Sequence, residues 1–308
     1  MIGRHMAQQS VPVDLTPSDP LISVVIISYN QGEYLAATIQ SVVSQTYQNK
    51  EIILIDGASE DSSVDVIKKY SEYLSYWISE KDNGQSDAIQ KGFQRAQGSI
   101  IGWVNSDDLL HPDTLSLVSR KAKERHVTDA VFYGGYEWID EEGKVVERFK
   151  SELHVSCVAR KIGANICQPG TFFGRQAYRR VGGIDSSLRY AMDRDLFLRF
   201  ANSPVPFLRI DKPLAQFRKT RTQKGHSHEY ALLCQKETEE LDNRYRLVTG
   251  VRSAPYGALR QVLRLATNYY PHTWLFRMRQ GRVRPYSVYR PTDEGLPAAA
   301  RPDRDHEQ

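Results

Sequence analysis

Cysteine is scarce in this chain, and long apolar runs are absent. Three cysteines in 308 residues, with no CxxC spacing, encode neither a disulfide framework nor a zinc knuckle, so we expect reduced, mostly buried thiols. No stretch approaches the roughly 18 uninterrupted apolar residues that a membrane-spanning helix needs. The amino terminus lacks the basic-then-apolar order of a signal peptide. These absences predict a globular, cytoplasmic protein.

Acidic residues and lysine are missing from residues 251–290, which hold eight arginines. The formal net charge of the whole chain is only +4, so this segment is strongly basic and the body is near neutral. Aromatic residues lie between the arginines, and this composition favours an anionic membrane surface as the partner of residues 252–290. A helix packed on the body of the protein is the alternative. No nucleic-acid-binding motif occurs, so we expect no nucleic acid partner.

Two common nucleotide-binding signatures are also missing. The first predicted strand does not lead into GxGxxG, and no P-loop pattern occurs in the chain. Hydride transfer on a dinucleotide and P-loop phosphoryl transfer are therefore not favoured.

Short runs rich in β-branched residues alternate with helical spacing over the first part of the chain. The predicted strands are 22–28, 51–56, 74–79 and 100–104. This alternation predicts an α/β fold with a doubly wound, mostly parallel sheet, followed by a mixed second half. We divide the chain into a disordered leader over 1–20, a first half over 21–125, a second half over 126–225, a helical basic extension over 226–290 and a disordered tail over 291–308.

Polar side chains follow the ends of these strands. Ser28, Tyr29 and Asn30 come after the first strand, and Asp56 comes after the second. The third loop holds Asp82, Gln85 and Asp87, and the fourth strand leads into Asp107 and Asp108. Carboxylates gathered at one edge repel each other unless a cation or a donor-rich ligand lies among them. A divalent metal ion that holds a diphosphate meets both conditions.

The motifs ISVVIISYNQGEYL, IDGASEDSS, EKDNGQSDAIQKGF, GWVNSDDLL, QPGTFFGR and VGGIDSSLRYAMDRDLFLRF follow one another between about Leu21 and Arg218. This ordered set resembles the family 2 glycosyltransferases of the GT-A fold, in particular the bacterial polysaccharide and O-antigen type. The resemblance implies a Rossmann-like GT-A domain. Its first half would bind a nucleotide sugar, and its second half would bind the acceptor and carry the catalytic base.

The same resemblance implies an inverting transfer of sugar from a nucleotide diphosphate donor, most often UDP-linked, with Mn²⁺ or Mg²⁺ as cofactor. The acceptor would be a hydroxyl of a glycan. A polyprenyl diphosphate at the inner face of the bacterial plasma membrane is one carrier on which such a glycan could be built. A catalytically silent sugar-nucleotide-binding subunit remains open as an alternative. A sugar-nucleotide pyrophosphorylase is another, but it requires a Gly-rich basic loop after the first strand, and SYNQGEY is not such a loop.

Site residues follow from the matched positions. The nucleotide-sugar site would comprise Ser28, Tyr29, Asn30, Asp56, Asp87 and Asp107, with Asp56 accepting the uracil imide N–H. Asp107 and Asp108 would bind the metal, and Asp193 would be the general base. Gln168 and Asp195 would lie near the acceptor or the donor sugar. Simpler roles stay open for several of these residues. Asp56 could be a plain turn residue at the end of its strand, and Asp107 and Asp108 could belong to a turn or a helix cap. Asp193 could be a helix cap, Asp195 an i,i+4 partner of Arg199, and Gln168 a backbone-bonding side chain.

Four positions depart from the family's pattern. They are Gly57 for the second acid of an aspartate pair, Asn105 for the first acid of DSDD, Ile89 for an arginine and Thr220 for a histidine. The diphosphate contact is then missing or supplied by Lys91 or Arg95. His226 or His228 could replace the absent histidine as a third metal ligand.

Overall fold

The computed structural model describes residues 19–163, 166–220, 228–248 and 254–266. The predicted tail, nearly all of the predicted leader and much of the basic extension lie outside the described residues, as does His226. Among the helices described, none is long and apolar enough to cross a membrane.

Nine strands of the described part form one sheet. They are β1 (Ile22–Ser28), β2 (Lys50–Asp56), β3 (Tyr76–Ser79), β4 (Ile100–Asn105), β5 (Leu109–Leu110), β6 (Val131–Ile139), β7 (Val145–Phe149), β8 (Phe172–Gly174) and β9 (Phe207–Arg218). The strand order is β3-β2-β1-β4-β8-β6-β9-β5, and β7 pairs with β6. Strands β1 to β4 are parallel, whereas β8 runs antiparallel to both of its neighbours. The predicted parallel first half and mixed second half are confirmed.

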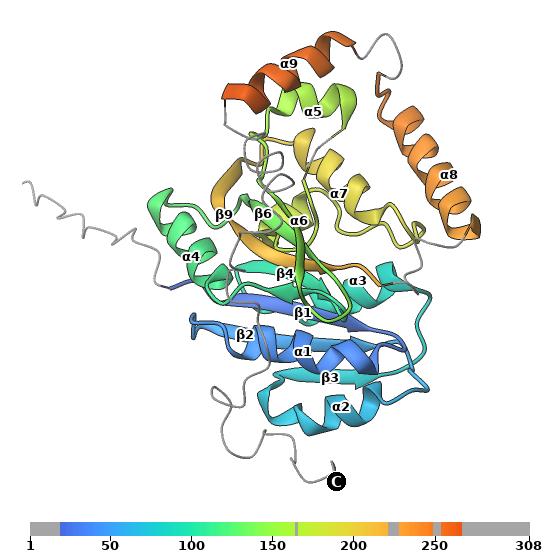
Figure 1. Cartoon of the computed structure of the whole chain (residues 1–308). Helices are drawn as coiled ribbons and strands as arrows, with labels where there is room; N and C mark the ends of the chain where they lie inside the picture. The colour runs from blue at the N-terminus through green and yellow to red at the C-terminus, as the bar shows by residue number, and fades with distance from the viewer. Residues whose placement is uncertain (1–18, 164–165, 221–227, 249–253, 267–308) are drawn as a thin grey trace, which may run out of the picture.

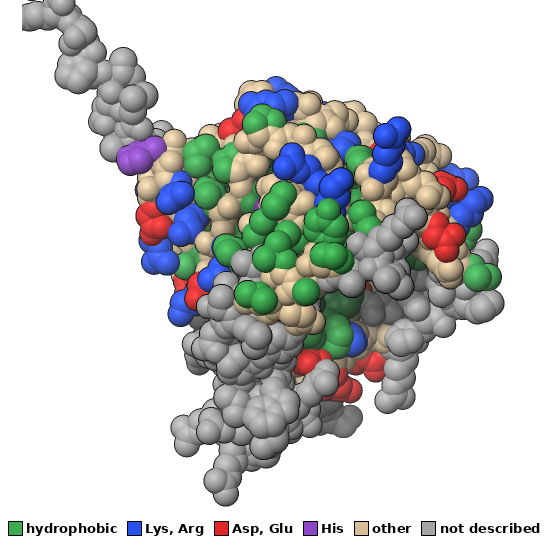
Figure 2. Space-filling model, turned by 90° about the horizontal axis from the view of Figure 1, so that it is seen from above, with side chains coloured by type: hydrophobic (Ala, Val, Ile, Leu, Met, Phe, Trp, Pro, Cys, Tyr) green, Lys and Arg blue, Asp and Glu red, His purple; other side chains and the backbone are tan. Residues whose placement is uncertain are grey.

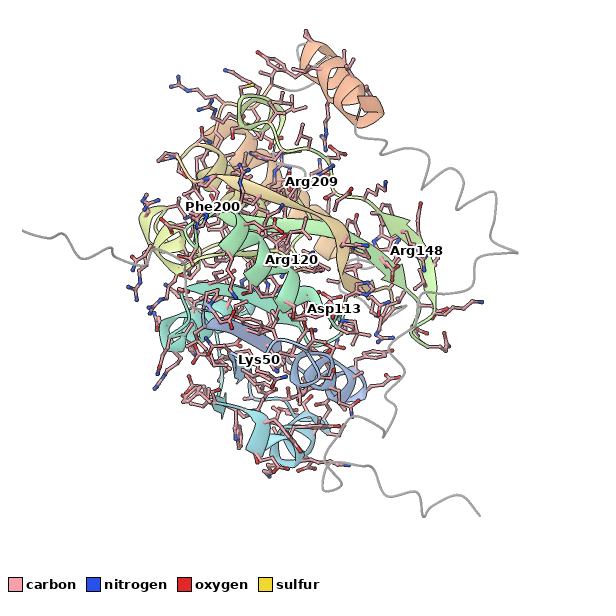
Figure 3. All side chains as sticks on the ribbon, turned by 90° about the vertical axis from the view of Figure 1, so that its left-hand side faces the viewer. Lys50, Asp113, Arg120, Arg148, Phe200 and Arg209 are labelled. Carbon is pink, nitrogen blue, oxygen red and sulfur yellow. The ribbon has the colours of Figure 1, made fainter. Side chains whose placement is uncertain are left out.

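Helices cover both faces of this sheet (Figure 1). They are α1 (Gly32–Val43), α2 (Ser63–Lys69), α3 (Gln85–Arg95), α4 (Thr114–Glu124), α5 (Ser156–Ile162), α6 (Arg175–Arg180), α7 (Met192–Ala201), α8 (His228–Arg244) and α9 (Ala254–Ala266). One hydrophobic cluster joins the sheet to α1, α2 and α4, and a second joins it to α3, α6, α7 and α8. Figure 3 faces the side of α4, with Asp113 at its start and Arg120 farther along it.

Strand β1 shows why the apolar runs become central strands. Val24 and Ile26 belong to the cluster with α1, whereas Val25 and Ile27 belong to the cluster with α3. Every residue of β1 is buried. A strand buried on both faces needs apolar residues without polar alternation, which is the pattern that predicted it.

Two elements were not predicted. Strand β5 has two residues, and it forms only because it pairs with β9, more than 100 residues later in the chain. The residue before helix α5 is Val155, which is not a capping residue type, so the usual mark of a helix beginning is missing. The three cysteines form no disulfide, but the prediction of mostly buried thiols is wrong, because Cys157 is exposed and Cys167 and Cys234 are half-buried.

Candidate active site

The carboxyl ends of the parallel strands bring the first group of predicted residues to one edge of the sheet. In the register of β1 and β2, Ser28 lies opposite Asp56. On the other side of β1, Ile27 lies opposite Asn105, the last residue of β4. The loops after β1, β2 and β4 are therefore neighbours, and Asp56 and the Asp107 loop flank Ser28.

Asp56 is fully buried and already bonded on both carboxylate oxygens. Oδ1 accepts a hydrogen bond from Ser59 Oγ at 2.5 Å, and Oδ2 accepts bonds from Ser59 N at 2.9 Å and Ser79 Oγ at 2.7 Å. These bonds join the loop after β2 to the end of β3. Asp56 therefore stabilises the loop after β2 and its contact with β3, beneath the exposed side chains at the carboxyl edge.

The Asp82 carboxylate lies beside Gly57, in the space that a side chain at residue 57 would enter. Asp82 Oδ2 is 2.7 Å from the position that a Cβ on Gly57 would take, and Tyr29 Cδ2 is 3.3 Å from it. Asp82 Oδ1 accepts a hydrogen bond from Gly84 N at 2.8 Å, and Oδ2 accepts none within the described part of the chain. Asp82 therefore fills the space of the missing family aspartate. The Gly57 substitution was the sequence feature that could have identified it.

Two neighbouring side chains of the first loop suit a ligand. Tyr29 is 54% exposed, which is unusual for a tyrosine at the end of a buried strand. Ser28 is 4% exposed, and its Oγ has no hydrogen-bond partner in the described residues. Because buried polar atoms are nearly always paired, this hydroxyl indicates a partner that the described residues do not supply.

Asn30 holds the first two loops together. Its φ is +51°, and that of Ala58 is +62°, so both non-glycine residues adopt the left-handed region. Asn30 N donates to Ser59 Oγ at 2.8 Å, and Glu60 N donates to Asn30 Oδ1 at 2.9 Å. Strained backbone of this kind persists where surrounding contacts impose it, and it clusters at functional sites.

Asp108 lies beneath the fourth loop. It is fully buried, and its oxygens accept hydrogen bonds from Arg218 N at 3.1 Å and Asn105 Nδ2 at 3.0 Å. Burial, together with the charge of Asp107, raises the pKa of Asp108 well above its usual value. Asp107 is partly exposed. The two adjacent acids therefore occupy different environments, and Asp107 is the one at the surface of the edge.

Arg218 connects this loop to the second half of the molecule. Its guanidinium donates to the carbonyl oxygens of Asp107 at 3.1 Å, Asp140 at 3.0 Å and Glu141 at 2.7 Å. It also lies over the ring of Tyr34, 4.8 Å from the centroid. Arg218 is 4% exposed, so these contacts fix the Asp107 loop against the turn between β6 and β7.

The described residues contain no group of three His, Cys, Asp or Glu side chains placed to hold a metal ion. Such a cage is not required for Mg²⁺ beside a diphosphate, because one or two carboxylates and the phosphate oxygens complete its coordination. Asp107 fits the part of the single carboxylate. Thr220, in the place of the family histidine, is buried, and the side chains of His226 and His228 lie outside the described residues.

Asp87 and Gln85 lie in the first turn of α3. Asp87 Oδ2 accepts a hydrogen bond from Asn83 N at 3.0 Å and lies 3.5 Å from Lys91 Nζ. Gln85 Nε2 donates to Asn105 Oδ1 at 2.9 Å, which joins the third loop to the end of β4. The Asp87 carboxylate is thus partly used within its own loop, and Gln85, to which no role was assigned, is the residue that contacts β4.

The two cations considered for the diphosphate are both engaged elsewhere. Lys91 Nζ lies 2.9 Å from Glu80 as well as close to Asp87. Arg95 is in the last turn of α3 and lies over the ring of Tyr76, at the start of β3. Because α3 begins at the carboxyl edge, its last turn lies at the opposite edge, so Arg95 is far from the site along the helix.

The second half of the site centres on Cys167, Gln168 and Asp193. Gln168 is buried and its Nε2 donates to Trp103 O at 2.8 Å, so it bonds to the β4 backbone. Burial, followed by the charges of Asp108 and Asp193, raises the pKa of the Cys167 thiol. The Gln168 bond joins the segment before β8 to β4, whose end leads into the Asp107 loop.

Asp193 and Asp195 share the first turn of α7 but differ in surroundings. Asp193 is partly exposed and its Oδ1 accepts from Arg194 N at 2.7 Å; burial among protein atoms raises its pKa. Asp195 is 1% exposed. Its Oδ2 accepts from Arg199 at 2.6 and 2.8 Å, and its Oδ1 accepts from Tyr245 at 2.7 Å. Asp195 is thus the i,i+4 partner of Arg199.

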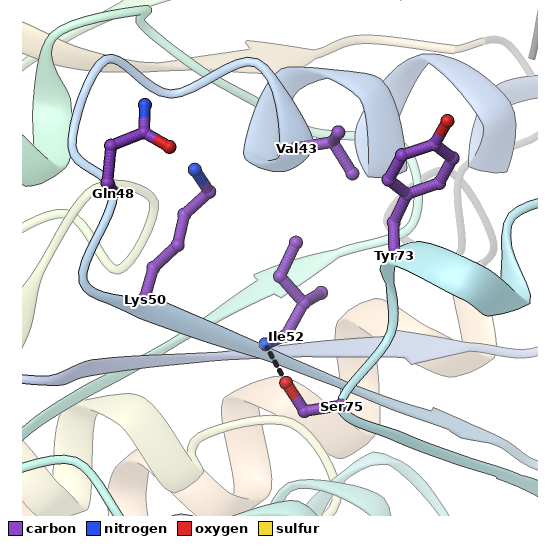
Figure 4. Close-up of a pocket in the computed structure, with 6 residues that line it drawn as sticks. All are labelled: Val43, Gln48, Lys50, Ile52, Tyr73 and Ser75. Atoms are coloured by element: carbon purple, nitrogen blue, oxygen red, sulfur yellow. Dashed lines mark hydrogen bonds between the residues drawn. The ribbon is translucent and has the colours of Figure 1, made fainter. Parts of the chain in front are cut away.

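One pocket lies away from this edge (Figure 4). Its lining includes Val43, Gln48, Lys50 and Tyr73. Lys50 is the first residue of β2, so the pocket lies at the amino ends of the strands. The Lys50 ammonium donates to the carbonyl oxygens of Gln45 and Tyr47, at 3.2 and 2.9 Å. It contributes nothing to the carboxyl edge.

The sequence of this chain is similar to those of known glycosyltransferases. The family model described as "Glycosyl transferase family 2" matches residues 23–181. An uncharacterised glycosyltransferase of Rickettsia typhi is 28% identical over 192 residues, which are 59% of this chain and 58% of that protein. Chondroitin synthase of Escherichia coli is 26% identical over 197 residues, or 63% of this chain and 28% of that protein. The chain thus spans less than two thirds of these relatives.

Solved structures show the same fold. S. aureus TarS 1–349 in complex with UDP-GlcNAc gives a TM-score of 0.54 at 15% identity, over 72% of this chain and 66% of that one. The mannosyltransferase PcManGT from Pyrobaculum calidifontis, in complex with GDP-Man and Mn²⁺, gives 0.52 at 15% identity, over 89% and 83%. The predicted GT-A fold is confirmed, and the resemblance found in the motifs is confirmed by the family match. The chain belongs to glycosyl transferase family 2.

Proposed function

We propose that this protein is an inverting glycosyltransferase that moves a sugar from a nucleoside diphosphate donor to a hydroxyl of a glycan in cell-surface polysaccharide synthesis. The observation that carries the proposal is the approach of two loops from different halves of the sheet. Asp107 follows β4, and Asp193 lies in the first turn of α7. Ser86 Oγ of α3 donates a hydrogen bond to Leu188 O, five residues before Asp193, and Gln168 Nε2 donates to Trp103 O of β4. A donor held at the first loop can thus reach a base in the second.

The nucleoside would bind over the loops after β1, β2 and β3. The exposed Tyr29 ring offers a stacking surface, and the buried Ser28 hydroxyl offers an unused polar group. We assign the base N–H to the Asp82 carboxylate, because Asp56 is fully buried and already accepts three hydrogen bonds, whereas Asp82 Oδ2 accepts none among the described residues. UDP is the favoured nucleotide, and the complexes of TarS with UDP and UDP-GlcNAc support this choice.

Asp107 would hold Mn²⁺ or Mg²⁺ together with the diphosphate, and Asp108 would fix the loop beneath it. When bound, such an ion neutralises charge on the leaving diphosphate. The Mn²⁺ in the complex of PcManGT supports a divalent ion in this fold. Lys91 and Arg95 are left out of the diphosphate site because of their contacts with Glu80 and Tyr76.

Asp193 would act as the general base. As the acceptor oxygen attacks the anomeric carbon, its hydroxyl proton passes to the Asp193 carboxylate, and the bond from that carbon to the diphosphate oxygen breaks. The diphosphate leaves with the bonding electrons, and attack from the opposite face inverts the anomeric carbon. A carboxylate whose pKa is raised by burial is a stronger base than an exposed aspartate, which suits this step.

A donor screen tests the proposal. The protein with Mn²⁺ is given UDP-, GDP- and dTDP-linked sugars and glycan acceptors, and release of the nucleoside diphosphate is measured. We expect one nucleotide class to be consumed, faster when an acceptor is present. Binding without turnover of any donor would favour the silent sugar-binding subunit. Pyrophosphate formation from a nucleoside triphosphate and a sugar phosphate would favour the pyrophosphorylase.

We further propose that the face made by α5 and α9 rests on an anionic membrane, where a lipid-linked acceptor such as a polyprenyl diphosphate glycan would lie. Leu153, Leu259 and Val262 are 45%, 45% and 60% exposed. Figure 2 shows this face from above, with hydrophobic side chains gathered in its middle and Lys and Arg side chains around them. The protein would then be peripheral, on the inner face of the bacterial plasma membrane.

Vesicle binding tests this membrane contact. Arg260 of α9 is paired with Glu152 at 2.8 Å, so lipid attraction would come from the apolar residues and from arginines elsewhere in 251–290. We expect Leu259→Ser with Val262→Ser to weaken binding to phosphatidylglycerol vesicles but not nucleotide binding. Equal vesicle binding by this variant and the unaltered protein would contradict the proposal.

A further inference from the structure

Helix α8 lies outside the segment that the family model matches, yet it faces the loop that leads to Asp193. Glu237 and Leu241 are four residues apart on one face of α8, and Tyr245 follows directly after the end of the helix. Leu241 is fully buried in the same hydrophobic cluster as Leu196 of α7. Helix α8 is thus packed against the part of the molecule that carries the proposed base.

Glu237 binds three consecutive backbone N–H groups of that loop. Oε1 accepts from Arg189 N at 2.8 Å, and Oε2 accepts from Tyr190 N and Ala191 N, both at 2.9 Å. These residues come immediately before α7. Three charge-assisted hydrogen bonds from one side chain fix the direction in which the loop enters the helix. Because Asp193 is two residues beyond Ala191, its position depends on that direction.

Neighbouring contacts hold this loop and the first turn of α7 that follows it. On the α8 side, Asp242 Oδ1 lies 2.6 Å from Arg194 Nη2, and Tyr245 donates to Asp195 at 2.7 Å. On the donor side, Ser86 Oγ in the first turn of α3 donates to Leu188 O. The loop therefore bonds to α3 on one side and to α8 on the other. Glu237 makes three of its bonds to α8.

We propose that Glu237 is a positioning residue for the catalytic base: its carboxylate orders the loop 187–191 so that Asp193 faces the acceptor hydroxyl. This role rests on the proposed function of Asp193. A carboxylate is needed at position 237 because both oxygens accept hydrogen bonds, whereas an amide has one acceptor oxygen and one donor nitrogen. The glutamine variant keeps the shape of the side chain and cannot satisfy all three N–H groups.

The matched pair Glu237→Gln and Glu240→Gln tests this proposal. Both changes remove one negative charge from α8, and Glu240 is exposed. Hydrogen–deuterium exchange of the peptide covering 187–196 is measured for each variant and the unaltered protein. The melting temperature, the nucleotide affinity, and kcat and KM for the donor found in the screen are measured beside it.

We expect Glu237→Gln alone to speed exchange in 187–196 and to lower kcat by about 10–100-fold, because small displacements of a catalytic group are costly. Nucleotide affinity should change by less than about twofold, since the donor loops are untouched. The proposal is overturned if exchange and kcat match those of Glu240→Gln, or if only the melting temperature falls. If the unaltered protein turns over no donor, the proposed function fails, and the exchange data alone decide whether Glu237 orders the loop.

Discussion

The two halves of the sheet build their parts of the site in different ways. In the first half, the ends of β1 to β4 are neighbours because the strands are parallel. Asn30 bonds the loop after β1 to the loop after β2, and Gln85 bonds the loop after β3 to the end of β4. In the second half, Asp193 depends on contacts with α8, which comes more than 30 residues later. One half is ordered by topology, and the other by side chains from distant segments. The second half should therefore be the more easily disturbed.

The largest effect on kcat is expected when the two acids of α7 are replaced by asparagine, one at a time. Asp193→Asn removes the proposed base, and we expect kcat to fall by about 10²–10⁴-fold with unchanged nucleotide affinity and melting temperature. Asp195→Asn should do the reverse, because it breaks a buried pair with Arg199 and costs about 3 kcal/mol of folding stability. Steady-state kinetics and thermal unfolding of both variants check this. Equal losses of kcat would show that the two acids are not divided in this way.

The next largest effect is expected on the free energy of unfolding, when Arg218, which connects the two halves of the sheet, is replaced. Arg218→Met leaves three backbone carbonyl oxygens without their donor, and we expect it to lower the free energy of unfolding by about 3 kcal/mol. Nucleotide affinity should fall as well, since the Asp107 loop loses its support. Lys212→Met, at an exposed position of β9, is the control. If denaturant unfolding gave the same free energy of unfolding for both variants, Arg218 would not be what holds the two halves together.

A smaller change tests the first half alone. Gly57→Ala places a methyl group 2.7 Å from Asp82 Oδ2, so the carboxylate must move. Because it is the end of a side chain that moves, we expect little change in stability and a loss of nucleotide affinity of about tenfold. Gly257→Ala, where a Cβ would meet nothing within 4 Å, is the control. Unchanged affinity in Gly57→Ala would argue against Asp82 as the acceptor of the base N–H.

The smallest expected effect is a shift on the pH axis. Burial raises the pKa of Asp193 above the ordinary value of an aspartate, and the carboxylate works as a base only when deprotonated. Activity should thus be full above the raised pKa and be lost as the pH falls through it, so the acidic limb of kcat lies higher than for an exposed aspartate. The limb is measured from kcat at saturating donor. A limb at or below the ordinary aspartate range would contradict this role.

The first half could be predicted from the sequence because its rules are local. An apolar run buried on both faces marks a parallel strand, and the residue at its end lies at the carboxyl edge, so Ser28, Asp56 and Asp107 were placed correctly at that edge. The pattern does not say which acid is buried. Asp107 and Asp108 are adjacent, and their difference comes from Arg218 and Asn105, which no spacing rule brings together.

The second half was harder to predict because its contacts are long-range. The Asp195 carboxylate is bonded by Arg199 and by Tyr245, which comes fifty residues later, and its role near the acceptor stays a prediction. Glu237 carried no mark in the sequence, since a glutamate in a polar helix is usually a solvated residue. Its role follows only from the loop packed against it. The roles of the site residues in the reaction stay predictions until the variants are measured.

The most direct test of the account is calorimetric titration of UDP, GDP and dTDP, with and without Mn²⁺, into the unaltered protein, Asp107→Asn and Asp113→Asn. Asp113 is exposed and bonds to Thr46, at the end of α1 away from the site. We predict that one nucleotide binds in a Mn²⁺-dependent manner, that Asp107→Asn abolishes this dependence and that Asp113→Asn retains it. Binding that is independent of Mn²⁺, or unchanged in Asp107→Asn, would contradict a nucleotide-sugar site built on Asp107.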